Sequence, residues 1–276
     1  MDGSTDLQGK KALGDTILAA SSKQQNAHVA HTRQIIAFTL WAVGFVLLLV
    51  ASVIVRFHPA PWPVELQTSI TLQYLQLWSA LSTPIVLASI VDNVLPSAIS
   101  LIAWFVGLSL IGVFVWRRGG SPIPWFVTAS FISPGTAVAD GLNWIIGFSV
   151  ARPRPSSPLI HVYMHETVPS FPSGHVENDV VYYGFLLYLS FTKPVSEWRY
   201  RWVLIPFQLY AVLNILLIGY SRVYEGSHWL IDVLAGYLTG ALLLVLLIFL
   251  YRWTLEMLTK RRARRLSVQP LQAQPA

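Results

Sequence analysis

Residues 229–253 read WLIDVLAGYLTGALLLVLLIFLYRW and carry only two charged side chains, Asp232 near the start and Arg252 near the end. A helix needs about 20 apolar residues to cross the roughly 30 Å hydrocarbon layer of a bilayer, so this segment predicts a membrane-spanning helix. The whole chain of 276 residues is 54% hydrophobic and 12% charged, which is too apolar for an ordinary soluble domain. The sequence therefore predicts a membrane protein.

Five further segments have the character of spanning helices. Val176–Phe191 is short and begins with Glu177 and Asp179, but its core is apolar enough to insert beside other helices. Trp62–Asn93 is interrupted by a glutamate, glutamines and a proline, which favours a helix lying in the membrane interface. We predict an all-α, polytopic membrane protein with six transmembrane helices in a bundle and an interfacial helix after the first span. The other five spans are Ile35–Val55, Leu95–Trp116, Trp125–Val150, Val176–Phe191 and Trp202–Tyr220.

The basic residues indicate how this bundle is oriented. With six spans every lysine falls on the side of the two tails, and cytoplasmic segments are the ones that carry excess lysine and arginine. The basic residues that give the net charge of +6 are thus explained by the orientation of the protein in the membrane. No nucleic-acid partner is therefore expected. We predict a polar cytoplasmic tail over residues 1–34, a membrane domain over 35–253 and a basic cytoplasmic tail over 254–276, in a cell membrane. The extracytoplasmic face then receives the connections 56–94, 151–175 and 221–228.

The last of these connections begins the stretch SRVYEGSHWLID (Ser221–Asp232), which also includes the first residues of the next predicted span. This stretch carries several ionisable groups beside a bilayer, where such groups usually have a function. The chain has no cysteine, so no thiolate chemistry is available. His228 and Asp232 are four residues apart at a predicted helix start, which puts them on one face and lets the carboxylate hold one imidazole nitrogen. The other nitrogen is then free as a nucleophile. Arg222 lies one turn away, where its planar fork could bind phosphate oxygens.

Two more polar stretches are predicted on the same face. In VPSFPSGHVEND (Val168–Asp179), Ser173 and His175 lie at the start of a predicted helix, whose free N–H groups and dipole favour an anion. In VARPRPSSP, Arg152 and Arg154 follow the preceding span and are stiffened by prolines. Together the three stretches predict an anion-binding site with two histidines.

These residues resemble the three-part signature of the type 2 phosphatidic acid phosphatase superfamily. The parts are Arg154–Pro155, Pro172–His175, and Ser221–Arg222 followed by His228 and Asp232. The resemblance implies that His228 attacks phosphorus to form a phosphohistidine, that Asp232 orients it, and that His175 protonates the leaving alkoxide. It also implies a reaction without metal or cofactor. The groups it assigns to the phosphoryl oxygens are Arg154, Arg222, Ser173 and the N–H of Gly174.

The sequence departs from this signature at one position. The family normally has a lysine seven residues before the arginine of its first motif, and here that position is Gly147. One phosphate-binding cation is therefore missing, and our hypothesis is that Arg152 supplies part of its charge. The gap also keeps open an altered substrate preference, a slower turnover or a loss of activity.

The predicted function is hydrolysis of a lipid phosphate or diphosphate whose chain enters from the bilayer. Phosphatidic acid, phosphatidylglycerol phosphate and a polyprenyl diphosphate fit equally, and the oligomeric state is open. Two alternatives stay open: a lipid phosphotransferase that uses the same triad, and a non-catalytic lipid-phosphate binder or transporter. We interpret Glu225 as a salt-bridge partner of Arg222. The remaining polar residues are interpreted as solvated loop residues (His161, His165 and Glu166) or interhelical hydrogen-bonding residues (Asp140 and Asn143).

Overall fold

The computed structural model describes residues 3–75, 94–163 and 166–268, and these ranges contain helices and connections but no strand. Residues 1–47 and 48–276 form two separate units. The first unit consists of the beginning of α1 (Gly3–Phe57). The second unit holds the end of α1 and all other elements, namely α2 (Pro63–Tyr74), α4 (Val94–Arg117), α5 (Ile123–Ser130), α6 (Thr136–Val150), α7 (Gly174–Phe191), α8 (Ile205–Tyr224) and α9 (Leu230–Val268).

Helix α1 begins much earlier than the predicted first span at Ile35, and it ends just before Pro59. Pro59 is the first proline of the chain. Because proline cannot donate a helical hydrogen bond and clashes with the preceding turn, it is the first residue that ends the helix. The predicted tail over residues 1–34 is therefore helical from Gly3 onward.

Among the described residues, four helices are long and apolar enough to cross a membrane. They are His31–Phe57, Leu95–Arg117, Arg201–Tyr224 and Leu230–Arg265, and they contain four of the six predicted spans. The predicted span Trp125–Val150 is divided into α5 and α6 by a π-helical turn, Phe131–Gly135, which contains Pro134. The remaining predicted span, Val176–Phe191, lies in α7, whose first turns contain the buried residues Glu177 and Asp179. Of the predicted interfacial segment, residues 63–74 form α2, and residues 76–93 lie outside the described residues.

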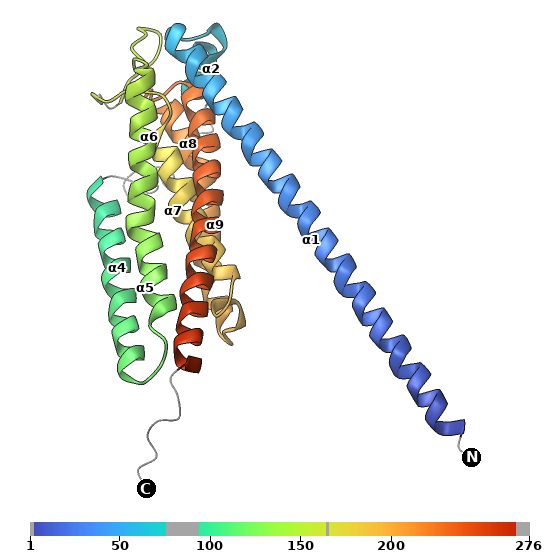
Figure 1. The fold of residues 1–276 in the computed structure, drawn as a ribbon. Helices are drawn as coiled ribbons and strands as arrows, with labels where there is room; N and C mark the ends of the chain where they lie inside the picture. Colours follow the sequence, from blue (N-terminus) through green and yellow to red (C-terminus); the bar gives the residue numbers. More distant parts are fainter. Residues whose placement is uncertain (1–2, 76–93, 164–165, 269–276) are drawn as a thin grey trace. The chain divides into compact units, whose positions relative to one another are not determined.

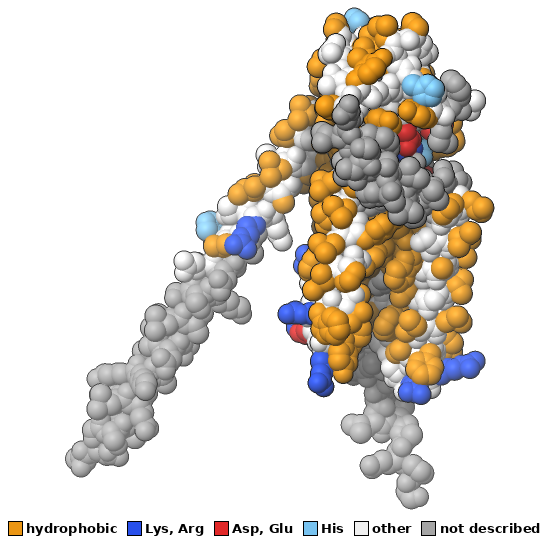
Figure 2. Space-filling model, turned by 180° about the vertical axis from the view of Figure 1, so that it is seen from behind, with side chains coloured by type: hydrophobic (Ala, Val, Ile, Leu, Met, Phe, Trp, Pro, Cys, Tyr) orange, Lys and Arg blue, Asp and Glu red, His pale blue; other side chains and the backbone are white. Residues whose placement is uncertain are grey.

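Helix α7 is the centre of the bundle. It packs most extensively against α9 and then against α8 and α6 (Figure 1). The core of these contacts includes Val181 and Phe185 of α7 with Leu247 and Tyr251 of α9, all buried. On the face of the bundle seen in Figure 2, hydrophobic side chains cover the helices and lysine and arginine side chains gather at one end. This distribution fits a surface whose middle contacts lipid.

The contact between α7 and α9 depends on two glycines of α9. A Cβ added to Gly240 would lie 2.7 Å from the Val180 Cβ, and one added to Gly236 would lie 2.7 Å from the Ser173 carbonyl oxygen. Small residues let two helix backbones approach closely inside a membrane. The start of α7 is therefore held directly against α9, next to the predicted site residues.

We expect Gly236→Ala to destabilise the protein by about 1–3 kcal/mol, because the new methyl group overlaps a backbone oxygen that cannot move alone. Thermal unfolding of the purified protein in detergent measures this. Gly107→Ala in α4 is the matched control, since a Cβ there meets no atom within 4 Å. Equal midpoints for the two variants would contradict the close packing.

Candidate active site

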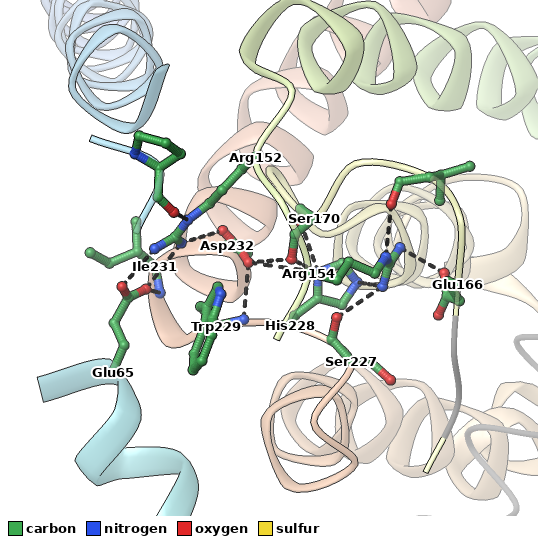
Figure 3. Close-up of polar contacts among 12 residues, drawn as sticks. Glu65, Arg152, Arg154, Glu166, Ser170, Ser227, His228, Trp229, Ile231 and Asp232 are labelled. Carbon is green, nitrogen blue, oxygen red and sulfur yellow. Dashed lines mark hydrogen bonds and ion pairs between the residues drawn. The ribbon is translucent and has the colours of Figure 1, made fainter. Parts of the chain in front are cut away.

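Backbone hydrogen bonds join the three predicted polar connections at one end of the bundle. The Ser173 N–H donates to the carbonyl of Asp232 over 3.0 Å, and the Ser170 N–H donates to the carbonyl of Arg152 over 2.9 Å. A third bond of 3.0 Å runs from the Tyr163 N–H to the Glu225 carbonyl. The side chains of all three stretches therefore meet in one polar cluster (Figure 3).

His228 is buried and held in one orientation. Its Nδ1 lies 2.7 Å from the carbonyl oxygen of Ser170, which can only accept a hydrogen bond, so Nδ1 carries the proton. Its Nε2 lies 3.2 Å from Nη1 of Arg154 and keeps its lone pair. Burial, together with the positive charge of Arg154, lowers the pKa of His228 well below its usual value. The imidazole is therefore neutral, which is the form of histidine that can act as a nucleophile.

Asp232 reaches His228 through a serine that the sequence did not indicate. The Asp232 Oδ2 lies 4.0 Å from the His228 Nδ1, while Ser170 Oγ donates to that same Oδ2 over 2.6 Å and lies 3.3 Å from Nδ1. The Trp229 N–H also donates to Oδ2, over 2.9 Å. The only sequence signal for Ser170 is its place in the stretch that contains Ser173. Its contacts make it the bridge between the carboxylate and the imidazole.

Arg154 is held beside His228 by main-chain oxygens and by one carboxylate. Its Nε donates to the Val168 carbonyl and its Nη1 to the Ser227 carbonyl, both over 2.9 Å. Its Nη2 forms an ion pair of 2.6 Å with Glu166, which was interpreted as a solvated loop residue. A carboxylate that pairs with this fork occupies the kind of contact that a phosphate would make.

Arg222 and His175 are two further residues of the site. Arg222 is buried and its Nη2 forms an ion pair of 3.0 Å with Glu225, as predicted. The His175 ring lies 6.5 Å from the His228 ring, centroid to centroid. Burial and the charges of Arg222 and Arg154 lower the pKa of His175 to about 3. Without an anion in the site, both histidines are therefore neutral.

Ser173 and Gly174 lie where the chain enters α7. Ser173 is fully buried, and its Oγ has no hydrogen-bond partner among the described residues. Gly174 is the first residue of the helix, so its N–H belongs to the turn whose donors have no partner within the helix. Both groups can donate to an anion, which is the role that the resemblance implies for them.

Arg152 lies among carboxylates and a main-chain oxygen. Its fully buried guanidinium forms two hydrogen bonds with Glu65, of 3.1 and 2.7 Å, and one of 2.6 Å with Asp232 Oδ1. Its Nε donates to the Pro59 carbonyl over 3.2 Å. Carboxylates thus surround this fork, and the hypothesis that Arg152 supplies part of the missing lysine's charge stays a prediction. The pairing with Glu65 had no signal in the sequence, because 87 positions separate the two residues.

A cavity of about 620 Å³ adjoins the cluster and extends between α4, α6 and α7. Arg154, His175 and Gly174 line one part of it, and Gly147 lines it too. A Cβ at Gly147 would lie 3.3 Å from the Phe171 carbonyl oxygen. His228 is not one of the residues that line this cavity, but its Nε2 lies 3.2 Å from Arg154, which does line it.

Residues 127–256, which include the whole polar cluster except Glu65, match the family model of the PAP2 superfamily. This region belongs to the PAP2 superfamily. The predicted resemblance is thus confirmed. The matched region contains α6, α7, α8 and most of α9, and the three motifs lie in the connections between these helices or at their ends.

Known proteins with PAP2 character are similar to this chain. An undecaprenyl-diphosphatase of Sulfolobus acidocaldarius is 33% identical over 107 residues, 38% of this chain and 46% of the relative. Phosphatidylglycerophosphatase B of Bacillus subtilis is 36% identical over 107 residues, 38% of this chain and 49% of the relative. The chain thus spans about half the length of these relatives. A crystal structure of a transmembrane PAP2-type phosphatidylglycerolphosphate phosphatase from B. subtilis has the same fold, with a TM-score of 0.52 and 20% identity over 76% of this chain and 94% of that one. Together with the four apolar helices, these matches make the chain an integral membrane protein.

A bound dianion should raise the pKa of His175 from about 3, because it offsets the nearby arginine charges. Binding of sulfate, whose own charge stays constant near neutral pH, is then expected to take up protons and to strengthen as the pH falls. Calorimetric titration in two buffers of different ionisation enthalpy measures the uptake. His175→Ala should reduce it, and an unchanged uptake would show that His175 does not face the anion.

Removal of the Glu166 charge should favour anion binding. In Glu166→Gln the carboxylate no longer competes for Arg154 or repels the anion, so sulfate affinity should rise about threefold or more. Glu197→Gln is the matched control, because Glu197 pairs with Lys193 on the exposed surface. A weaker affinity in Glu166→Gln would mean that Glu166 holds Arg154 ready rather than competing for it.

Proposed function

We propose that the protein hydrolyses a lipid phosphate or diphosphate at the extracytoplasmic membrane face through a phosphohistidine intermediate. The observation that carries this proposal is the state of His228, whose Nε2 carries no proton and accepts a hydrogen bond from Arg154 of the first motif. A protein that merely binds phosphate has no need of a buried neutral histidine with a fixed tautomer. The relatives named as lipid phosphatases support the same activity.

The proposed reaction has two steps. Nε2 of His228 attacks phosphorus and forms the N–P bond while the P–O bond to the lipid breaks, and His175, protonated once the anion is bound, gives its proton to the departing oxygen. Neutral His175 then takes a proton from water, whose oxygen attacks phosphorus and releases phosphate from His228. Arg154, Arg222, the Ser173 hydroxyl and the Gly174 N–H stabilise the charge on the phosphoryl oxygens.

The membrane arrangement that we propose has six spans over residues 35–253, with both termini in the cytoplasm. The continuous stretch from α5 through the π-helical turn to α6 provides one of the two additional spans, and α7 provides the other. The end of α4, next to Arg117 and Arg118, and the end of α7, next to Lys193, lie at the end of the bundle opposite the start of α7 (Figure 1). Since basic residues favour the cytoplasmic side, the site faces outward.

The cavity between α4, α6 and α7 supports lipid as the substrate. Leu101, Trp144 and Phe148 line it beside the polar groups, so an acyl or isoprenyl chain can occupy the apolar part while its phosphate meets Arg154 and His175. The names of the two relatives cover both a polyprenyl diphosphate and a phosphatidylglycerol phosphate. Both substrate classes are therefore included in the proposal.

The test is phosphate release by purified protein in detergent from phosphatidic acid, phosphatidylglycerol phosphate and undecaprenyl diphosphate, in the presence of a chelator. We expect His228→Ala to lower kcat by at least about a thousandfold, because the nucleophile is lost. His31→Ala, a change at an exposed histidine of α1, should keep wild-type activity.

Substantial activity in His228→Ala would overturn the phosphohistidine mechanism. Transfer of the phosphoryl group to an added alcohol or sugar at the expense of water would identify a phosphotransferase. Tight binding of the lipids without any release would identify a binding protein.

A further inference from the structure

Glu65 is a buried carboxylate outside all three motifs and outside the PAP2 match, yet it belongs to the polar cluster. It lies in the first turn of α2 and is fully buried. Its Oε2 accepts the Trp62 N–H over 2.9 Å and its Oε1 accepts the Ile231 N–H over 3.1 Å. Glu65 therefore joins α2 to the residue that precedes Asp232 (Figure 3).

Glu65 also binds Arg152 through both oxygens, and Arg152 in turn binds Asp232. Every oxygen of the two carboxylates accepts a hydrogen bond from an N–H or O–H donor, an arrangement that favours the ionised form. The guanidinium is always charged. Glu65, Arg152 and Asp232 together form a buried group with two negative charges and one positive charge. The net charge of this group is therefore negative.

The sign of this net charge matters for His228. If Glu65 were absent, the positive charge of Arg152 would cancel the negative charge of Asp232. The pair would then produce little negative electrostatic potential at His228. The second carboxylate shares Arg152, so that negative charge remains 4.0 Å from Nδ1. Among the described residues, Arg154, Arg222 and His175 are the other titratable groups that act on the imidazole. The two arginines are themselves paired with carboxylates, Arg154 with Glu166 and Arg222 with Glu225.

A neutral imidazole becomes a cation when Nε2 takes up a phosphoryl group and Nδ1 keeps its proton. That positive charge develops on a buried ring whose Nε2 lies 3.2 Å from Nη1 of Arg154. A nearby negative charge then stabilises the phosphorylated ring and the transition state that precedes it.

We infer that Glu65 is a positioning residue that acts through Arg152: it fixes Asp232 and preserves the negative charge that stabilises the phosphorylated His228. This role rests on the proposed phosphohistidine chemistry. It also assigns a catalytic contribution to α2, an element that the family match does not include. Glu65 touches neither substrate nor His228, so its effect is on the rate of phosphoryl transfer and not on substrate affinity.

The first test is Glu65→Gln, which keeps the shape and removes the charge. We expect kcat and the burst rate of phosphoenzyme formation to fall by at least about tenfold, with KM changed by less than about twofold. Glu256→Gln is the matched control, because Glu256 pairs with Lys260 at the exposed end of α9 and should behave like wild type. Glu65→Asp keeps the charge and should retain more activity than Glu65→Gln.

The double variant Glu65→Gln with Arg152→Gln separates charge from structure. It restores one net negative charge at Asp232, so kcat should recover at least about threefold relative to Glu65→Gln. A double variant as slow as, or slower than, Glu65→Gln would overturn the charge role. If Glu65→Gln does not fold, an activity of Glu65→Asp below about one tenth of wild type, at an unchanged unfolding temperature, would equally contradict it.

Failure of this inference can be told apart from failure of the proposed function. Wild-type protein that releases no phosphate from any lipid contradicts the proposed function. Wild-type protein that is active while Glu65→Gln matches it in kcat and burst rate contradicts the role of Glu65 alone.

Discussion

A buried guanidinium is stable only where carboxylates or carbonyls surround it, and the site is arranged around this requirement at Arg152. Its partners come from three separate parts of the chain: Pro59 in the connection after α1, Glu65 in α2 and Asp232 in α9. Loss of one partner of a buried ion pair typically costs about 3–5 kcal/mol, because a charge is left without compensation. This single cation therefore fixes the positions of α2, the segment after α6 and the start of α9 relative to one another.

The main chain does much of the remaining positioning. Carbonyl oxygens of Val168, Ser170 and Ser227 orient Arg154 and His228, and the Ser173 N–H fixes the start of α7 to α9. These contacts depend on the path of the loops between the helices. The helices fix the two ends of each loop. The close approach of α7 and α9 at Gly236 and Gly240 is thus a condition for the geometry of the site as well as for the stability of the bundle.

The sequence predicted the parts of this structure that follow local rules. The spacing of His228 and Asp232 placed them on one side of a helix start, and the motifs placed Arg154, His175 and Arg222 near them, where the structure has them. The pair of Arg152 and Glu65 could not be predicted, because 87 positions separate its members and either residue alone fits many environments. Ser170 was missed for a related reason, since its role depends on where its loop passes His228. The division of a predicted span into α5 and α6 reflects Pro134, whose effect on a helix depends on its neighbours.

The Ser170 carbonyl that accepts the His228 proton has a consequence for how the site can change. A side-chain acceptor disappears with one codon change, but a main-chain oxygen is present whatever residue stands at that position. The tautomer of His228 is thus inherited with the route of the loop, independently of the side chains around it. Variants can exchange the apolar residues of the cavity wall, such as Leu101, Trp144 and Phe148, and still keep Nε2 unprotonated, provided that the loop keeps its path.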